Sequence, residues 1–226
     1  MEDAAKFPQR LIDGYTTFLS ERLPVEQTRF RDLAEIGQRP EIMAIGCCDS
    51  RVSPEVIFDA RPGELFVVRN IANIVPPYEP DARAHGVSAA LEFGVLALQV
   101  KHIVVLGHAR CGGVQAFVQN AEPLTPSDFI GNWMKLMAPA AARTPRDGLS
   151  AGDYLTRLEQ ANVVNSLDNL MTFPRIAPLI KNGAVMAHGA YFGVATGELS
   201  VLDRASGAFT PVAAEQHAKA FGAPRF

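Results

Sequence analysis

The sequence contains few cysteines and no long apolar run. Its three cysteines, Cys47, Cys48 and Cys111, are too few and too odd in number for a disulfide framework. No apolar stretch approaches the roughly 18 to 20 residues that a membrane-crossing helix needs. The N-terminal residues also lack the basic head and apolar core of a secretory signal. We therefore expect a cytoplasmic protein with no membrane partner, whose cysteines are ligands, nucleophiles or core side chains.

An excess of charge of one sign is also absent. The 226 residues include 21 Lys and Arg against 24 Asp and Glu, which gives a formal net charge of −3. This balance leaves no basic surface for a phosphate backbone, so we expect no nucleic-acid partner. Because 48% of the residues are apolar, the chain can bury a substantial core, and we predict a single domain over residues 1–226.

The N-terminal segment has the periodicity of helices. Apolar side chains recur about every 3.6 residues over Leu11–Leu19, the pattern breaks at Pro24, and it resumes over Phe30–Ile36. The single domain is therefore predicted to have three parts: an N-terminal helical arm (1–40), an α/β core (41–205) and a C-terminal tail (206–226). We expect a partner chain to help order the tail from Ala213 onward.

The core has the pattern of a mainly parallel sheet. Short, nearly continuous runs of apolar and β-branched residues are typical of strands buried on both faces. The stretches Ala84–Val100 and Gly152–Met171 predict helices that cover the sheet. The fold class is therefore α/β, a mainly parallel sheet flanked by helices. About four parallel strands and one antiparallel edge strand are predicted: Ile42–Gly46, Leu65–Val68, Ile103–Gly107, Ala184–Tyr191 and the edge Glu198–Asp203.

Thiol, imidazole and carboxylate groups follow directly after two of these strands. The segment Cys47–Arg51 follows the first strand, and His108–Gly113 follows the third. The carboxyl ends of parallel strands are where α/β sheets bind ligands, and the crossover makes these two strands neighbours. Two thiolates and an imidazole favour zinc. We therefore predict a zinc site that combines Cys47 with His108 and Cys111.

Three protein ligands leave one zinc position for water, as in catalytic zinc sites. Asp49, two residues after the first cysteine, can accept a proton from such a water while Arg51 keeps the carboxylate ionised. The pair Gly112-Gly113 lets the backbone approach the metal or its ligand closely. These residues indicate a catalytic metal rather than a structural one.

Simpler interpretations exist for each residue alone. A single cysteine at a strand end is commonly a core side chain. Asp49 and Arg51 can form a loop ion pair before the helix that starts near Ser53-Pro54. The remaining histidines have no thiol or acid partner at chelating spacing, so we assign them structural roles: His85, His102, His188 and His217.

Together, the motifs resemble those of the β-class carbonic anhydrases. The resemblance implies one Zn²⁺ per chain, held by Cys47, His108 and Cys111, and a catalytic dyad of Asp49 and Arg51. It covers roughly residues 30 to 205 and rests on these segments: Cys47–Arg51, Pro62–Asn73, Gly107–Gly113, Asn162–Val164 and His188-Gly189.

The resemblance also implies a substrate pocket for CO2 and bicarbonate. Gln38 stands nine residues before the first cysteine ligand, where plant-like members of the family place a glutamine that hydrogen-bonds the substrate. The apolar wall around CO2 maps to Phe66, Ile71 and Phe93, and Gly112-Gly113 belongs to the same binding region.

One position separates two branches of the family. Ala44 stands where another branch carries a tryptophan that helps to form a non-catalytic, inhibitory bicarbonate site. The resemblance therefore predicts the plant-like active-site type without that inhibitory site.

The implied activity is the reversible hydration of CO2 to bicarbonate and a proton, by attack of zinc-bound hydroxide. Members of the family are at least dimeric and exchange strands and helical arms. We therefore expect a homo-oligomer, a dimer or a dimer-based tetramer, in which Gln38 reaches the site of the partner.

Three other functions stay open. A relative with the same zinc site can hydrolyse carbon disulfide or carbonyl sulfide. A zinc-binding or thiol-redox module would use Cys47 and Cys48 as a reactive pair, although adjacent cysteines bridge only with strain and C-x-x-C is absent. A non-catalytic, zinc-stabilised subunit would leave Asp49 and Arg51 without a role.

Cys48 occupies the variable position of the family motif, so we expect it to be a bystander.

Overall fold

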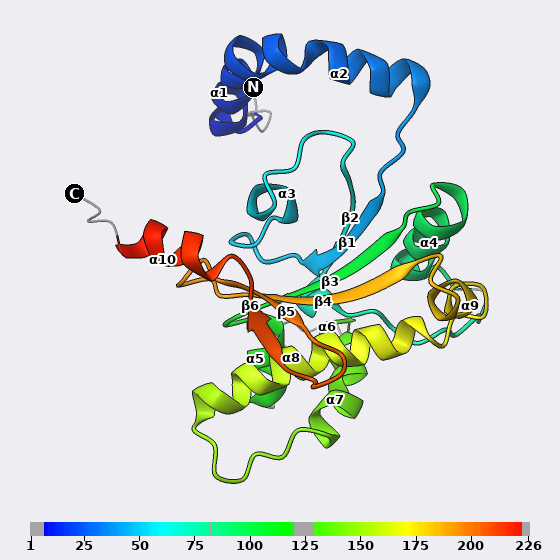
Figure 1. Cartoon of the computed structure of the whole chain (residues 1–226), viewed down its shortest axis with the longest axis vertical. Helices are drawn as coiled ribbons and strands as arrows, with labels where there is room; N and C mark the ends of the chain where they lie inside the picture. Colours follow the sequence, from blue (N-terminus) through cyan, green and yellow to red (C-terminus); the bar gives the residue numbers. More distant parts are fainter. Residues whose placement is uncertain (1–6, 82, 120–128, 223–226) are drawn as a thin grey trace, which may run out of the picture. The chain divides into compact units, whose positions relative to one another are not determined.

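The computed structural model describes residues 7–81, 83–119 and 129–222. The chain forms two compact units, Met1–Arg39 and Pro40–Phe226. Figure 1 shows the second unit as a sheet with helices packed along it. Among the residues that the structure describes, no helix is both long enough and apolar enough to cross a membrane.

The first unit is helical. It contains α1 (Gln9–Thr17), a π turn η1 (Phe18–Arg22) and α2 (Leu23–Ile36). Pro24 was expected to interrupt the helical pattern, but it lies in the first turn of α2, where its missing N–H would have no intrahelical partner anyway. No residue of these three elements is buried, and several of their apolar side chains are exposed in a single chain: Leu11, Ile12, Tyr15, Leu19, Val25 and Ile36.

The second unit is built on a six-stranded sheet of order β2-β1-β3-β4-β5-β6. The first four of these strands are parallel, and β5 and β6 are antiparallel. The predicted fold class is therefore confirmed. The bounds of the strands are β1 (Ile42–Cys47), β2 (Leu65–Asn70), β3 (His102–His108), β4 (Met186–Phe192), β5 (Leu199–Leu202) and β6 (Phe209–Pro211).

The segment expected to be a tail contains regular structure between Phe209 and Gly222. β6 adds a second antiparallel strand beyond the edge strand that was predicted, and α10 (Ala214–Gly222) follows it. The turn before β6 is fixed by Asp203, whose backbone carbonyl accepts from Gly207 N–H and whose carboxylate accepts from the Ser206 hydroxyl. A strand of three residues has no detectable alternation, which is why the sequence pattern did not indicate it.

The hydrophobic core lies between one face of the sheet and the helices α4 (Gly86–Glu92) and α8 (Ala151–Leu170). The predicted helix Ala84–Val100 is present as α4 and a π turn, η3 (Phe93–Ala97). The remaining helices are short: α3 (Pro54–Ile57), η2 (Ile71–Asn73), α5 (Gly112–Val118), α6 (Phe129–Met134), η4 (Lys135–Met137), α7 (Ala138–Ala142) and α9 (Ala177–Lys181).

The packing of α8 brings it very close to the sheet next to His108. A Cβ placed on Gly107 would lie 2.5 Å from Cγ2 of Val163, so only glycine permits this approach. Because β1 and β3 are paired in parallel, their carboxyl ends at Cys47 and His108 meet at one edge of the sheet. The fold therefore positions both predicted motifs side by side.

Candidate metal centre

Cys47, His108 and Cys111 form one buried cluster. Their ligand atoms all lie within 4.8 Å of one another, and the two Sγ atoms are 3.9 Å apart. Cys47 is 4% exposed, and His108 and Cys111 are each 1% exposed. The cluster contains soft sulfur and imidazole donors at a spacing that one zinc ion spans.

The orientation of His108 fits a metal ligand. Its Nδ1 lies 3.0 Å from the carbonyl oxygen of Ala109. Because a carbonyl only accepts, Nδ1 carries the proton and Nε2 has a free lone pair. In the described part of the chain, Nε2 is buried and has no hydrogen-bond partner. A buried polar atom of this kind needs a partner, and a zinc ion would provide it.

The pKa values of the Cys47 and Cys111 thiols are shifted in opposite directions. The hydrogen bond with the Cys111 thiol lowers the pKa of Cys47 well below its usual value and outweighs the effect of burial. The same hydrogen bond, together with burial, raises the pKa of Cys111. One negative charge in this pocket therefore opposes a second, and a dication stabilises both thiolates at once.

The backbone around the cluster is strained at several non-glycine residues. Ala72 (φ 63°), Asn73 (φ 48°) and Arg110 (φ 56°) all adopt left-handed conformations. As a consequence, the N–H of Ala72 points at Sγ of Cys47 at 3.4 Å. Such strain persists only where the surrounding contacts hold it, and it is concentrated at functional sites.

Asp49 and Arg51 form a bidentate pair beside the cluster. Arg51 donates from Nε to Oδ1 (2.9 Å) and from Nη2 to Oδ2 (2.7 Å), and its backbone N–H also donates to Oδ1 (3.0 Å). Arg51 Nη2 also reaches the carbonyl oxygen of Arg110 at 3.0 Å and so joins the two ligand loops. The hydrogen bonds from Arg51 hold the pKa of Asp49 well below its usual range, so the carboxylate stays ionised.

Sequence reasoning missed the role of Arg69. From β2, its Nε donates to the carbonyl oxygen of Cys47 (2.8 Å), and its Nη2 donates to that of Asp49 (2.7 Å). Arg69 fixes the loop that contains the first ligand and the carboxylate. Its only signal was its position inside the segment Pro62–Asn73 that carries the family resemblance.

The predicted pocket residues fall into separate groups. Ile71 lies against the metal loop, since a Cβ on Gly113 would come within 2.7 Å of its Cγ2, whereas the same position on Gly112 faces open space. Phe66 and Phe93 pack on each other with ring centroids 5.9 Å apart. Gln38 belongs to the first compact unit.

The aromatic pair is not beside the metal ligands of its own chain. Phe66 pairs with Met43, and it is Asn70, four positions later, that pairs with Cys47. At about 3.3 Å per residue, this offset is about 13 Å along the strand. Phe93 is also 49% exposed. The assignment of Phe66 and Phe93 to a pocket wall therefore stays a prediction that requires a second chain.

The other histidines have partners outside the cluster. His85 Nε2 lies 2.6 Å from Asp81 Oδ1, so the expectation that this histidine has no acid partner was wrong. His102 Nδ1 lies 3.1 Å from His188 Nε2, and His217 Nε2 lies 2.8 Å from the carbonyl oxygen of Thr196. Cys48 is exposed, in contrast to its neighbour Cys47.

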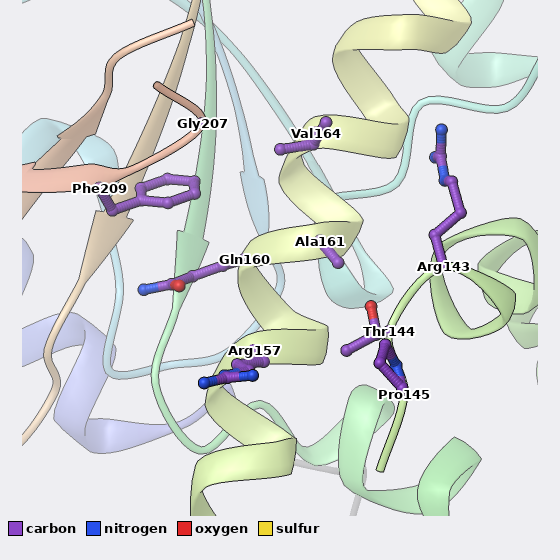
Figure 2. A pocket seen from close by; sticks show the side chains of 9 residues that line it. All are labelled: Arg143, Thr144, Pro145, Arg157, Gln160, Ala161, Val164, Gly207 and Phe209. Atoms are coloured by element: carbon purple, nitrogen blue, oxygen red, sulfur yellow. The ribbon is translucent and has the colours of Figure 1, made fainter. Parts of the chain in front are cut away.

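A hollow of about 390 Å³ lies beside α8, away from the cysteine–histidine cluster (Figure 2). Arg157, Gln160 and Val164 line it from the helix, with Phe209 on one side and the segment 143–145 on the other. None of the predicted site residues lines this hollow. This hollow is therefore not part of the predicted active site.

Comparison with known proteins agrees with this geometry. The carbonic anhydrase family model matches residues 42–199. The chain is similar to β carbonic anhydrase 3 of Arabidopsis thaliana, with 36% identity over 200 residues that cover 86% of this chain and 76% of the relative. The chain therefore belongs to the carbonic anhydrase family, in its β class, whose general reaction is the hydration of CO2.

Solved structures show the same fold. The β-carbonic anhydrase CcaA superposes with a TM-score of 0.84 at 30% identity, covering 90% of this chain and 98% of that chain. A β-carbonic anhydrase from Sordaria macrospora, described as tetrameric, superposes with a TM-score of 0.74 at 29% identity, covering 89% of this chain and 98% of that chain.

Proposed function

We propose that this chain catalyses the reversible hydration of CO2 to bicarbonate and a proton with one zinc ion held by Cys47, His108 and Cys111. The observation that carries the proposal is the buried cluster of these three side chains, in which His108 Nε2 has no partner among the described residues. When bound, zinc supplies a Lewis acid that makes water a nucleophile near neutral pH.

The ligand charges set the expected pH range of the reaction. Two thiolates cancel the double charge of zinc, whereas neutral imidazoles leave it in place. Water at a site with two thiolates is therefore harder to deprotonate than water at a site with three imidazoles. We expect activity that increases toward alkaline pH.

Asp49 is the residue that accepts a hydrogen bond from the reacting water and orients that water. Arg51 keeps this carboxylate ionised through two side-chain hydrogen bonds and prevents it from turning toward the metal. Without these bonds, Asp49 would be free to occupy the position that the water needs. Ile71 and Gly113 provide the adjoining wall from the same chain.

The remainder of the pocket is supplied by a second copy of the chain in this proposal. Phe66 and Phe93 form an aromatic patch about 13 Å along the strand from the level of Cys47. The helical arm has exposed apolar side chains that a partner would cover, including Leu11, Tyr15 and Val25. A homodimer, alone or as half of a tetramer, brings Gln38 and the aromatic pair of one chain to the metal of the other.

The active-site type follows from one residue. Ala44 is 1% exposed in β1 and provides neither the ring nor the N–H of a tryptophan. We propose the plant-like type without an inhibitory bicarbonate site.

The test compares two adjacent cysteines. CO2 hydration is measured by stopped flow from about pH 6.5 to 9 on the wild type, Cys47→Ser and Cys48→Ser, with zinc quantified in the same samples. We expect Cys47→Ser alone to lose both zinc and rate, because only the buried thiol is a ligand. If all three proteins hold zinc and none hydrates CO2, the reaction is wrong, and carbon disulfide and carbonyl sulfide are the next substrates.

A further inference from the structure

One face of α8 presents polar side chains to the two loops that carry the metal ligands. Glu159 and Asn162 lie three residues apart on this helix, are 3% and 1% exposed, and have no role in the proposed reaction. Residues three apart on a helix point in similar directions. Both side chains are fully inside the protein, so their contacts define what they do.

Glu159 holds the loop of the second thiolate. Its Oε1 accepts a hydrogen bond from the backbone N–H of Cys111 at 2.8 Å. Its Oε2 accepts from the hydroxyl of Tyr191 on β4 at 2.6 Å. Both carboxylate oxygens are therefore occupied, one by the metal loop and one by the sheet. The adjacent Arg110 has a φ of 56°, which this anchored loop can maintain.

Asn162 holds the segment that contacts the first thiolate. Its Nδ2 donates to the carbonyl oxygen of Ala72 at 2.7 Å. The N–H of the same Ala72 points at Sγ of Cys47 at 3.4 Å, which requires the left-handed φ of 63° at that residue. Asn162 is therefore hydrogen-bonded to the same residue whose N–H points at the first thiol.

Val163, next to Asn162 on α8, sets the distance between the helix and the sheet. Its Cγ2 occupies the space where Gly107 would have a Cβ, so α8 is in direct contact with the strand residue that precedes His108. Gly107 pairs with Tyr191 across β3 and β4, which places the tyrosine that binds Glu159 at the same level. One helical turn, one strand pair and two loops are thus mutually fixed.

We propose that Glu159 and Asn162 are positioning residues that hold the Cys111 and Cys47 thiolates from one turn of α8. The inference rests on the proposed zinc site and names the groups that orient its ligands. Partners of this kind, one step removed from a metal, change metal affinity by about 10- to 100-fold when they are removed.

The test measures how fast zinc leaves the protein. The zinc-loaded full chain is mixed with an excess of a chromogenic chelator, and the rate of zinc release is compared between each variant and the wild type. The urea denaturation midpoint of each protein is measured as well, so that a loss of general stability is recognised. Glu159→Ala and Asn162→Ala are each expected to release zinc about tenfold faster or more. Glu159→Gln is expected to recover most of the slow release, because the amide carbonyl still accepts from Cys111 N–H while the side chain keeps its shape.

A matched control separates positioning from general stability. Asn169 lies on the same helix and donates from Nδ2 to the carbonyl oxygen of Val75 at 2.7 Å, a bond of the same kind farther along the chain. Asn169→Ala is expected to lower the denaturation midpoint without faster zinc release. The proposal is overturned if Asn169→Ala releases zinc as fast as Glu159→Ala, or if neither Glu159→Ala nor Asn162→Ala changes the release rate.

Tyr191→Phe keeps the proposal testable if the alanine variants do not fold. It removes one hydrogen bond from Glu159 and fills the same space, so we expect an intermediate release rate; a rate equal to that of the wild type would count against the anchor on β4. Because zinc release is measured without CO2, failure of the hydration assay and failure of this proposal are distinguishable.

Discussion

Two regions of the sheet differ in whether a single chain is enough to form the predicted site. One region is the cluster at the ends of β1 and β3, and the other is the aromatic pair beside β2. At the carboxyl ends of β1 and β3, the three candidate ligand side chains are almost fully buried, and their donor atoms lie within 4.8 Å of one another. Beside β2, the predicted pocket residue Phe93 is 49% exposed and contacts Phe66 rather than the metal cluster. The first region is assembled by backbone topology within a chain, whereas the second needs another surface to become a pocket.

The largest expected effect is that of Arg51→Ala, which tests the site formed within one chain. Arg51→Ala should lower kcat by about 100-fold or more, because it removes the group that holds Asp49 in place to orient the reacting water. Zinc content should stay at the wild-type level, since Arg51 is not a ligand. Arg143→Ala, which breaks the 3.1 Å pair with Asp168 elsewhere on the surface, serves as the control. Unchanged turnover in Arg51→Ala would show that the dyad has no role.

The second prediction tests whether the pocket is shared between chains. Gln38→Ala should lower kcat/KM about tenfold with zinc retained, the effect of losing one hydrogen bond to substrate. Mixed dimers are then purified from co-expressed Cys47→Ser and Gln38→Ala chains that carry different tags.

If Gln38 acts on the partner's zinc, the mixed dimer contains one fully native site and recovers close to half of the wild-type rate. If Gln38 acts within its own chain, both sites of the mixed dimer are defective. In that case the rate does not rise above the average of the parents, and the shared pocket is rejected.

A smaller effect concerns stability and pH. Hydrogen bonds from Arg51 depress the pKa of Asp49 in the folded protein, so the carboxylate stabilises the fold above the unfolded carboxyl pKa of about 4. This contribution is lost as the pH falls through the folded pKa. The difference in unfolding free energy between the wild type and Asp49→Asn should therefore be full at pH 6 to 7 and shrink below about pH 4. Urea denaturation across this range checks it, and a difference that grows on acidification has the wrong sign.

The last prediction is that bicarbonate causes no cooperative inactivation of the enzyme. With Ala44 in β1, bicarbonate should inhibit only as a product, and the rate should fall hyperbolically with its concentration. Steady-state assays at increasing bicarbonate measure this. Cooperative inactivation would assign the chain to the branch with the inhibitory site and contradict the plant-like type.

Sequence patterns predicted that Cys47, His108 and Cys111 come together, because each of the two motifs follows a strand with a clear apolar run. Ile42–Gly46 and Ile103–Gly107 lie within β1 and β3, and parallel neighbours must end at one edge. The proximity of these three side chains therefore followed from local patterns and the crossover rule.

Other features had no local signal. Glu159 is 48 positions from Cys111, and nothing in its helix distinguishes a buried carboxylate from an exposed one. Arg69 lies in a strand whose residues are all half-buried, so alternation did not show where its side chain points. β6 is three residues long, below the length at which a period can be recognised.

The most direct test of the account is a zinc titration of the metal-free protein, with CO2 hydration followed by stopped flow at alkaline pH. The rate should be near zero before zinc is added, rise linearly and stop at one zinc per chain, and Cys48→Ser should give the same curve. Hydration without zinc, or one tightly bound zinc per chain with no hydration, would contradict the proposed reaction.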